Sequence, residues 1–131
     1  MNEVFDFLRD CGIFFVATVD GNQPKVRPFG FVMEYEGKLC FGTSNQKPFY
    51  EQLMTNPNIE ICATAKDFRW LRLSGKALFC TTKEAKAQAL EIMPTLKRMY
   101  SVEDNIFEIF YLENATANFR SMQGEDRTVN L

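Results

Sequence analysis

The stretch CFGTSNQKPFYEQLMTNP, from Cys40 to Pro57, decides how this chain folds. Its first residues are typical of a β-strand, whereas Phe49 and Leu53 recur at helical spacing until Asn-Pro ends the helix. Four polar residues stand where the strand gives way to the helix: Thr43, Ser44, Asn45 and Lys47. On these residues alone two interpretations stay open, an anion site at a helix N-terminus or a helix capped by Asn45.

Along the whole chain, apolar runs bounded by turn residues predict six strands, at residues 13–19, 24–35, 38–44, 58–65, 69–81 and 105–119. Asp20-Gly21 and Glu36-Gly37 predict tight turns, and Gly75 predicts a bulge within the fifth strand. Helices are predicted at residues 2–11, after Asn45, and from Thr82 to a kink or end near Pro94. Strands joined mostly by tight turns favour a mainly β fold, a small antiparallel barrel with peripheral helices.

Composition limits the class of protein. The chain has 131 residues, which favours a single domain over residues 1–131. Hydrophobic residues make up 46% and charged residues 24%, so the chain is expected to be globular. A net charge of −2 without a basic cluster argues against nucleic-acid binding. The sequence has no apolar run of membrane-spanning length and no basic-then-apolar leader, so we expect a cytoplasmic protein.

Cysteine and histidine usage limits the chemistry. The four cysteines (Cys11, Cys40, Cys62 and Cys80) are widely spaced in apolar surroundings, and they are interpreted as buried free thiols. There is no histidine, so no metal site is predicted and the commonest general base is missing. If the protein is an enzyme, a cofactor is expected to carry the reaction.

The order of these motifs resembles the pyridoxamine 5'-phosphate oxidase-like flavoproteins. The similarity covers about Phe14 to Leu78, through PKVRPF, LCFGTSNQK before the helix, Asn-Pro after it, and WLRLSGKA. It implies a six-stranded antiparallel FMN-binding split barrel. It also implies a homodimer that holds one FMN in each of two grooves between the subunits.

The resemblance implies which residues would bind the cofactor: Arg27, Pro28, Phe29, Gly30, Thr43, Ser44, Asn45, Lys47 and Trp70. The arginine and the polar cluster would bind the flavin phosphate, and the three residues after the arginine would run beside the isoalloxazine ring. The tryptophan would touch the flavin from the second subunit. From the residues alone, Pro28 is as typical of an edge strand, and Trp70 of a core or interface residue.

The sequence also departs from the family. Its tail, FRSMQGEDRTVNL, lacks the tryptophan-and-arginine motif with which the vitamin-processing oxidases grip their substrate phosphate. Lys47 stands one or two places further from Asn-Pro than the basic residue of the family does. The chain looks closer to the branch named for nitroimidazole resistance, although some members of that branch place a histidine near the flavin.

The function that the resemblance implies is an FMN-dependent oxidoreductase that exchanges electrons with NAD(P)H and a small electron acceptor. No catalytic side chain is predicted, because hydride transfer is the chemistry of the flavin itself. Two alternatives stay open. One is a non-catalytic flavin or deazaflavin module for electron transfer, and the other is a relative that binds haem in the same barrel.

Overall fold

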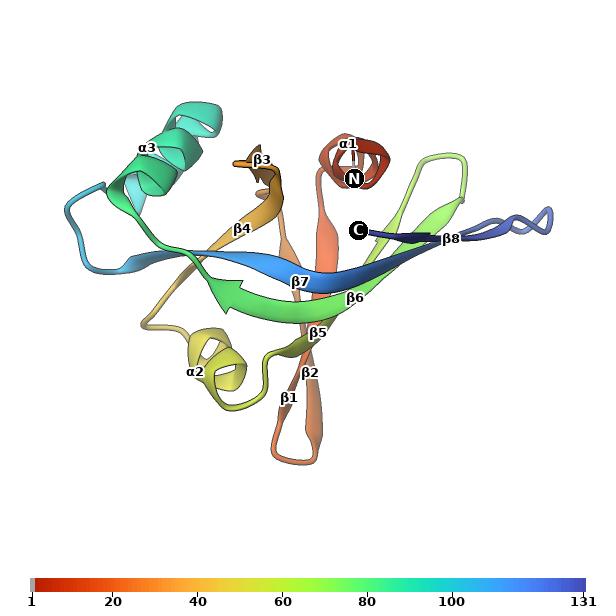
Figure 1. Cartoon of the computed structure of the whole chain (residues 1–131), viewed down its shortest axis with the longest axis horizontal. Coiled ribbons are helices and arrows are strands. Elements are labelled where there is room, and N and C mark those ends of the chain that lie inside the picture. Colours follow the sequence, from red (N-terminus) through yellow and green to blue (C-terminus); the bar gives the residue numbers. More distant parts are fainter. Residues whose placement is uncertain (1) are drawn as a thin grey trace.

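The computed structural model describes residues 2–131 as one open antiparallel sheet with helices at its margins (Figure 1). The strands are β1 (Phe14–Asp20), β2 (Gln23–Phe29), β3 (Met33–Tyr35), β4 (Lys38–Ser44), β5 (Asn58–Thr64), β6 (Trp70–Phe79), β7 (Phe107–Arg120) and β8 (Asp126–Asn130). The helices are α1 (Asn2–Cys11), α2 (Pro48–Thr55), α3 (Lys83–Ile92) and the 3₁₀ segment η1 (Pro94–Arg98). The strand order is β2-β1-β5-β6-β7-β4-β3, and β8 pairs with β7. The predicted class, mainly β with peripheral helices in a split antiparallel barrel, is confirmed.

The predicted number of six strands is wrong, because the sheet has eight within residues 2–131. The strand expected at residues 24–35 divides in two, since β2 pairs with β1 whereas β3 pairs with β4 at the other margin. Pro28 lacks an amide N–H for the ladder, and β2 ends at the next residue, Phe29. The chain leaves this part of the sheet at Gly30 and crosses to the other margin. The eighth strand, β8, forms in the polar tail, where Val129 packs against the core.

The turns and the bulge follow the prediction. Gly21 and Gly37 both have positive φ values, 61° and 75°, in the two predicted turns. At Gly75 the register of β6 against β7 shifts, as expected of a bulge. A β-carbon at Gly75 would lie 3.2 Å from the carbonyl oxygen of Glu113, so the two backbones approach closely at this point.

Two apolar clusters lie on opposite faces of the β4–β7 wall. Leu39 and Phe41 of β4 and Phe110 of β7 belong to the cluster inside the barrel, with α1 and α2. Cys40 and Ile109 belong to the second cluster, which α3 covers from outside (Figure 1). The middle of β4 and the beginning of β7 are therefore buried on both faces, unlike β5, whose residues alternate between buried and exposed.

Helix α3 forms as predicted. The hydroxyl of Thr82 accepts a hydrogen bond from the backbone N–H of Ala85 at 3.0 Å, and α3 ends before Pro94, which opens η1. No helix within residues 2–131 is long and apolar enough to cross a membrane.

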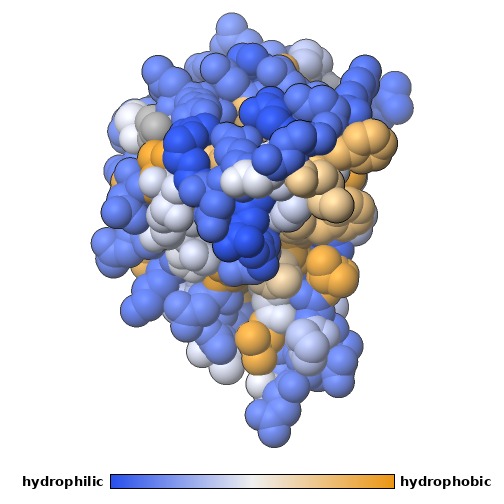
Figure 2. Space-filling view, turned by 90° about the vertical axis from the view of Figure 1, so that its right-hand side faces the viewer, coloured by the Kyte–Doolittle hydropathy of each residue, from blue (hydrophilic) through white to orange (hydrophobic). Residues whose placement is uncertain are grey.

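Apolar side chains remain exposed on one part of the surface. Figure 2 shows a face that is mostly hydrophilic, with an apolar strip along one side. At the β1–β2 margin, Ile13 is 56% exposed, Phe15 is 48% exposed and Val26 is 68% exposed. Phe15 lies opposite Pro28 of β2 on one side and opposite Cys62 of β5 on the other, so these three residues form one cross-strand row.

Candidate functional site

A cavity of about 230 Å³ lies where the ends of β2 and β4 meet the segment that leads into β7. One part of its lining comes from residues that the sequence analysis selected: Arg27, Pro28, Phe29, Gly30, Thr43 and Lys47. The rest of the lining is mostly apolar and includes Met93, Leu96, Met99, Tyr100 and Phe107. The cavity therefore has cationic groups on one side and an apolar wall on the other.

Arg27 is held in place by neutral partners. Its Nη1 donates to the carbonyl oxygen of Val16 at 3.0 Å and to the hydroxyl of Thr18 at 2.8 Å. Its Nη2 donates to the side-chain oxygen of Gln52 at 2.8 Å. The guanidinium also lies over the ring of Phe49, so helix α2 fixes it from two sides.

The two cations of the cavity have no acidic partner. Among residues 2–131, neither Arg27 nor Lys47 takes part in an ion pair within 4.0 Å. Partial burial lowers the pKa of Arg27 from its usual value, although a guanidinium stays charged at neutral pH. A partly desolvated cation without a counter-ion at the edge of a cavity is suited to an anionic ligand.

The turn between β4 and α2 uses its own amides internally. The N–H of Asn45 donates to the carbonyl oxygen of Ile106 at 2.9 Å, and that of Lys47 donates to the carbonyl oxygen of Ser44 at 3.2 Å. The hydroxyl of Ser44 accepts from the N–H of Gln46 at 3.1 Å. These three amides are therefore engaged within the protein, and the side chains of Lys47 and Thr43 are what the turn presents to the cavity.

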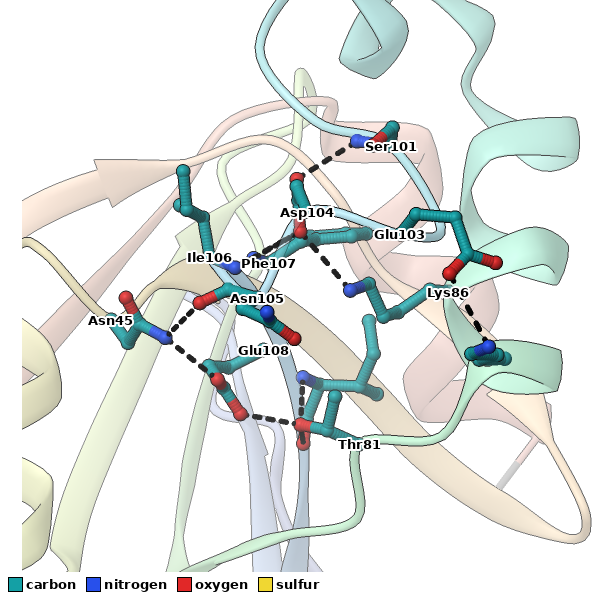
Figure 3. Close-up of polar contacts among 12 residues, drawn as sticks. Asn45, Thr81, Lys86, Ser101, Glu103, Asp104, Asn105, Ile106, Phe107 and Glu108 are labelled. Atoms are coloured by element: carbon teal, nitrogen blue, oxygen red, sulfur yellow. Dashed lines mark hydrogen bonds and ion pairs between the residues drawn. The ribbon is translucent and has the colours of Figure 1, made fainter.

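The predicted helix cap at Asn45 is wrong. The residue at the N-cap position of α2 is Lys47, which makes no side-chain cap, and Pro48 occupies the first turn. The side-chain Nδ2 of Asn45 instead donates to the carbonyl oxygen of Asn105 at 2.8 Å and to the carboxylate of Glu108 at 2.9 Å (Figure 3). Asn45 therefore ties the turn to the start of β7.

Asp104 organises the loop that leads into β7. Its carboxylate accepts hydrogen bonds from the N–H groups of Ser101, Ile106 and Phe107 and from the ammonium of Lys86 at 3.0 Å (Figure 3). Burial alone would raise the pKa of Asp104, but these hydrogen bonds outweigh burial and hold the pKa well below its usual range. The loop is consequently fixed on the side where it forms the cavity wall.

The apolar wall is built from a stacked pair of rings. Tyr100 and Phe107 lie 4.4 Å apart between ring centres, with only 10° between their planes. Phe107 crosses directly over Gly42 of β4, where a β-carbon would come within 2.7 Å of the ring. Only glycine at position 42 leaves room for this ring without displacing it.

The sequence matches the pyridoxamine 5'-phosphate oxidase family over residues 1–119. The chain belongs to this family. A crystal structure of a NimC/NimA family protein from Clostridium acetobutylicum is 43% identical in sequence, with 100% of this chain and 92% of that chain covered and a TM-score of 0.96. The resemblance stated from the sequence is therefore confirmed.

Solved structures with much lower sequence identity share the fold. One is an FMN-binding, pyridoxamine 5'-phosphate oxidase-related protein from Nostoc punctiforme, at 15% identity and a TM-score of 0.62, with 99% of this chain and 93% of that chain covered. Another is a haem-binding protein from Mycobacterium smegmatis, at 15% identity and a TM-score of 0.78, with 98% of this chain and 56% of that chain covered. None of the curated proteins is similar enough to count as a relative.

Three residues that the family resemblance implicates lie away from the cavity lining: Ser44, Asn45 and Trp70. The first two shape the β4–α2 turn. Trp70 pairs with Arg120 at the end of β7 that is farthest from Phe107. Within one chain, Trp70 therefore stands at the opposite end of the sheet from the cavity.

Several residues of the site were not selected from the sequence. Gln52 and Thr18, which hold Arg27, have no sequence signal of their own, because their roles depend on how α2 packs on β1. Met93 and Leu96 stand at and after the end of α3, and the Met-Pro break there is the one sequence signal that the chain turns back. Gly42 was read only as part of a strand.

Proposed function

We propose that this protein binds FMN in the cavity beside Arg27 and that it is an FMN-dependent oxidoreductase. The observation that carries the proposal is the position of Arg27, a cation without an acidic partner that neutral groups hold at the edge of a partly apolar cavity. A phosphate monoester carries about 1.5 to 2 negative charges at neutral pH. Arg27 and Lys47 supply matching positive charge.

The lining fits the two chemical halves of FMN. Arg27, Lys47 and Thr43 provide charge and a hydroxyl for the phosphate, whereas Phe29 and Phe107 offer apolar surface to a flat ring. A bound flavin would supply hydride and electron transfer, and the protein would supply binding, orientation and electrostatics. The FMN-binding description of the Nostoc punctiforme neighbour supports this choice of ligand.

The proposal includes a homodimer that completes the site. At about 230 Å³ the cavity of one chain is smaller than the roughly 300–1,000 Å³ usual for ligand pockets. The exposed row at the β1–β2 margin adjoins it, because Phe15 lies opposite Pro28, which lines the cavity. A second copy on this apolar margin would enclose the ligand, and Trp70 of that copy would contact the flavin.

The alternatives differ in ligand or in chemistry. Haem binding, described for the Mycobacterium smegmatis neighbour, would lack its usual proximal ligand because this chain has no histidine. A deazaflavin, or a flavin used only for electron transfer, would leave the phosphate contacts unchanged.

We propose NAD(P)H as the electron donor and a small molecule as the acceptor.

The test of binding is titration of the apoprotein with FMN and, as a phosphate-free control, with riboflavin. Arg27→Ala should weaken FMN binding by about 2–4 kcal/mol, as for a broken charge-assisted pair, and Lys47→Ala should weaken it less. Riboflavin affinity should change little in both variants. Lys25→Ala, which removes an exposed β2 cation outside the cavity lining, is the matched control and should behave like the unaltered protein.

Two results would contradict the proposal. Equal weakening of FMN and riboflavin by Arg27→Ala would mean that the arginine does not recognise the phosphate. Unchanged FMN affinity in both cavity variants would place the flavin elsewhere.

The test of catalysis is anaerobic addition of NADPH or NADH to the FMN-loaded protein. In an enzyme the nucleotide reduces the flavin and its yellow colour bleaches, whereas in an electron-transfer module only dithionite reduces it.

A further inference from the structure

A chain of side-chain hydrogen bonds joins the turn between β4 and α2 to the start of β7 (Figure 3). Its central residue is Glu108. One carboxylate oxygen of Glu108 accepts from the Nδ2 of Asn45 at 2.9 Å, and the other accepts from the hydroxyl of Thr81 at 2.7 Å. Glu108 is only partly exposed, and it does not line the cavity beside Arg27. Direct contact with a ligand in that cavity therefore does not account for a carboxylate held from two sides.

The hydroxyl of Thr81 fixes one oxygen of Glu108 to the sheet. Thr81 stands just after β6, and its hydroxyl also accepts from the backbone N–H of Ile109 at 2.9 Å. Ile109 is the neighbour of Glu108 on β7 and is fully buried. A hydroxyl that donates to a carboxylate and accepts from the backbone at the same time has a defined orientation. Glu108 is thus oriented by groups outside the lining of the cavity.

Asn45 is held on both its side chain and its backbone. Its Nδ2 has two hydrogens, and it donates to Glu108 and to the carbonyl oxygen of Asn105 at 2.8 Å. Its backbone N–H donates to the carbonyl oxygen of Ile106 at 2.9 Å. The position of Asn45 is therefore set by the segment that begins β7, and Glu108 is the only side chain among these three acceptors.

Asn45 stands midway between the two residues of this turn that line the cavity, Thr43 and Lys47. Thr43 also lies directly opposite Glu108 in the pairing of β4 with β7. Arg27, on the same cavity, is held separately, through contacts with β1 and α2. The two cationic parts of the cavity thus have independent supports, and their spacing depends on both supports.

We propose that Glu108 is a positioning residue for the flavin phosphate. Through Asn45 it sets where Thr43 and Lys47 lie relative to Arg27. This inference rests on the proposed binding of FMN in the cavity. Binding sites need their groups held to within about 0.5 Å by the residues behind them. Loss of the Glu108 contact should consequently weaken recognition of the phosphate and leave recognition of the flavin ring unaltered.

A direct effect of the Glu108 charge would have the opposite sign. A carboxylate repels a phosphate, so removal of the charge alone would strengthen FMN binding. Removal of a positioning contact weakens FMN binding instead. Glu108→Gln separates the two effects further, because the amide has no charge but keeps an acceptor oxygen for Asn45.

The experiment is titration of the apoprotein variants with FMN and with riboflavin. We expect Glu108→Ala to weaken FMN binding about 2–30-fold, the range for residues that influence a site without touching its ligand, while riboflavin affinity changes little. Asn45→Ala should act in the same way. The double variant should be no weaker than the weaker single variant, since both remove one contact. Glu108→Gln should bind FMN more tightly than Glu108→Ala.

The matched control is Glu113→Ala, which removes an exposed carboxylate from the same strand, outside the cavity lining. It should bind both flavins like the unaltered protein. Thermal unfolding curves check that each variant folds, and Asn45→Ala decides the question from the other side of the contact if Glu108→Ala does not fold.

Three results overturn the inference while the proposed function stands. They are unchanged FMN affinity in folded Glu108→Ala, an equal loss of FMN and riboflavin affinity, and tighter FMN binding, which would indicate a direct charge effect. For Asn45→Ala, an unchanged ratio of the two affinities has the same meaning. Absence of FMN binding by the unaltered protein instead overturns the proposed function, and this inference with it.

Discussion

The guanidinium carbon of Arg27 lies 4.7 Å from the centre of the Phe49 ring, and the same helix supplies Gln52 to bind its Nη2. Phe49 and Gln52 are both buried on α2, so their positions are set by packing against the barrel. Arg27 is thereby oriented before any ligand arrives. Preorganisation of this kind lowers the entropic cost of binding.

Removing the side chain of Gln52 should loosen this arrangement. We expect Gln52→Ala to lower the free energy of unfolding by about 1.5–3 kcal/mol, since the lost hydrogen bond has a charged donor. FMN affinity should fall, by less than in Arg27→Ala, while riboflavin affinity stays nearly constant. Urea unfolding and flavin titration check this, with exposed Glu51→Ala as control. A stability loss without any change in the ratio of FMN to riboflavin affinity would show that Gln52 does not position Arg27.

A charge on the exposed β1 row should dissociate the proposed dimer. Phe15→Glu places a carboxylate where a second copy would bury an apolar ring, so we expect a monomer in analytical ultracentrifugation and weaker flavin binding. The matched control is Met122→Glu, at a position 79% exposed and outside that row. A dimer that survives Phe15→Glu but dissociates in Met122→Glu would place the interface elsewhere.

The ion pair of Lys86 and Asp104 should contribute strongly to stability, because their side chains are only 7% and 13% exposed. Lys86→Met leaves the carboxylate buried without its cation, and we expect a loss of about 3–5 kcal/mol in urea unfolding. Lys83 and Glu103, from the same helix and loop, form a pair that is 69% and 75% exposed. Lys83→Met should therefore change stability by only about 0–1 kcal/mol. Equal effects of the two variants would contradict this account.

The pKa of Asp104 also predicts a pH dependence. Because folding lowers this pKa, the stabilisation is complete above the unfolded value of about 3.9 and is lost as the pH falls toward the lower folded value. The difference in unfolding free energy between the unaltered protein and Asp104→Asn should be constant near neutral pH and should shrink below about pH 4. A difference that grows on acidification would mean that the folded pKa is raised instead.

We expect no meaningful oxidation of pyridoxamine 5'-phosphate. In the vitamin-processing oxidases, a tryptophan-and-arginine motif in the tail grips the substrate phosphate. The tail of this chain lacks that tryptophan, and its residues 126–130 pair with β7 as β8. None of these residues lines the cavity. Steady formation of pyridoxal 5'-phosphate by the FMN-loaded protein, at rates typical of true oxidases, would refute this expectation.

Local sequence was sufficient for most of the fold. Tight turns at Gly21 and Gly37 and the bulge at Gly75 were predicted because each depends on a backbone conformation or close approach that favours glycine. The division between β2 and β3 was not predicted, although Pro28 and Gly30 marked the place. Whether a strand continues or changes partners depends on pairing with distant strands, here β1 and β4.

The site was predicted less completely, for the same reason. Arg27 and Lys47 follow from the motif order, whereas the use of Asn45 depends on contacts with Asn105 and Glu108, far along the chain. Local propensity favours Asn45 as a cap, but the tertiary contact prevails. The prediction of four buried free thiols is likewise only partly right, because Cys40 is buried whereas Cys62 is exposed on β5.

We expect positions 42 and 107 to vary together among related sequences. Their separation along the chain hides the fact that a β-carbon at position 42 and the aromatic ring at position 107 cannot occupy the same space. In proteins of this fold, a side chain at the first position should therefore accompany a smaller residue at the second, and glycine should accompany the ring. An evolutionary path between the two combinations is expected to shrink position 107 first, because the reverse order passes through an overpacked wall.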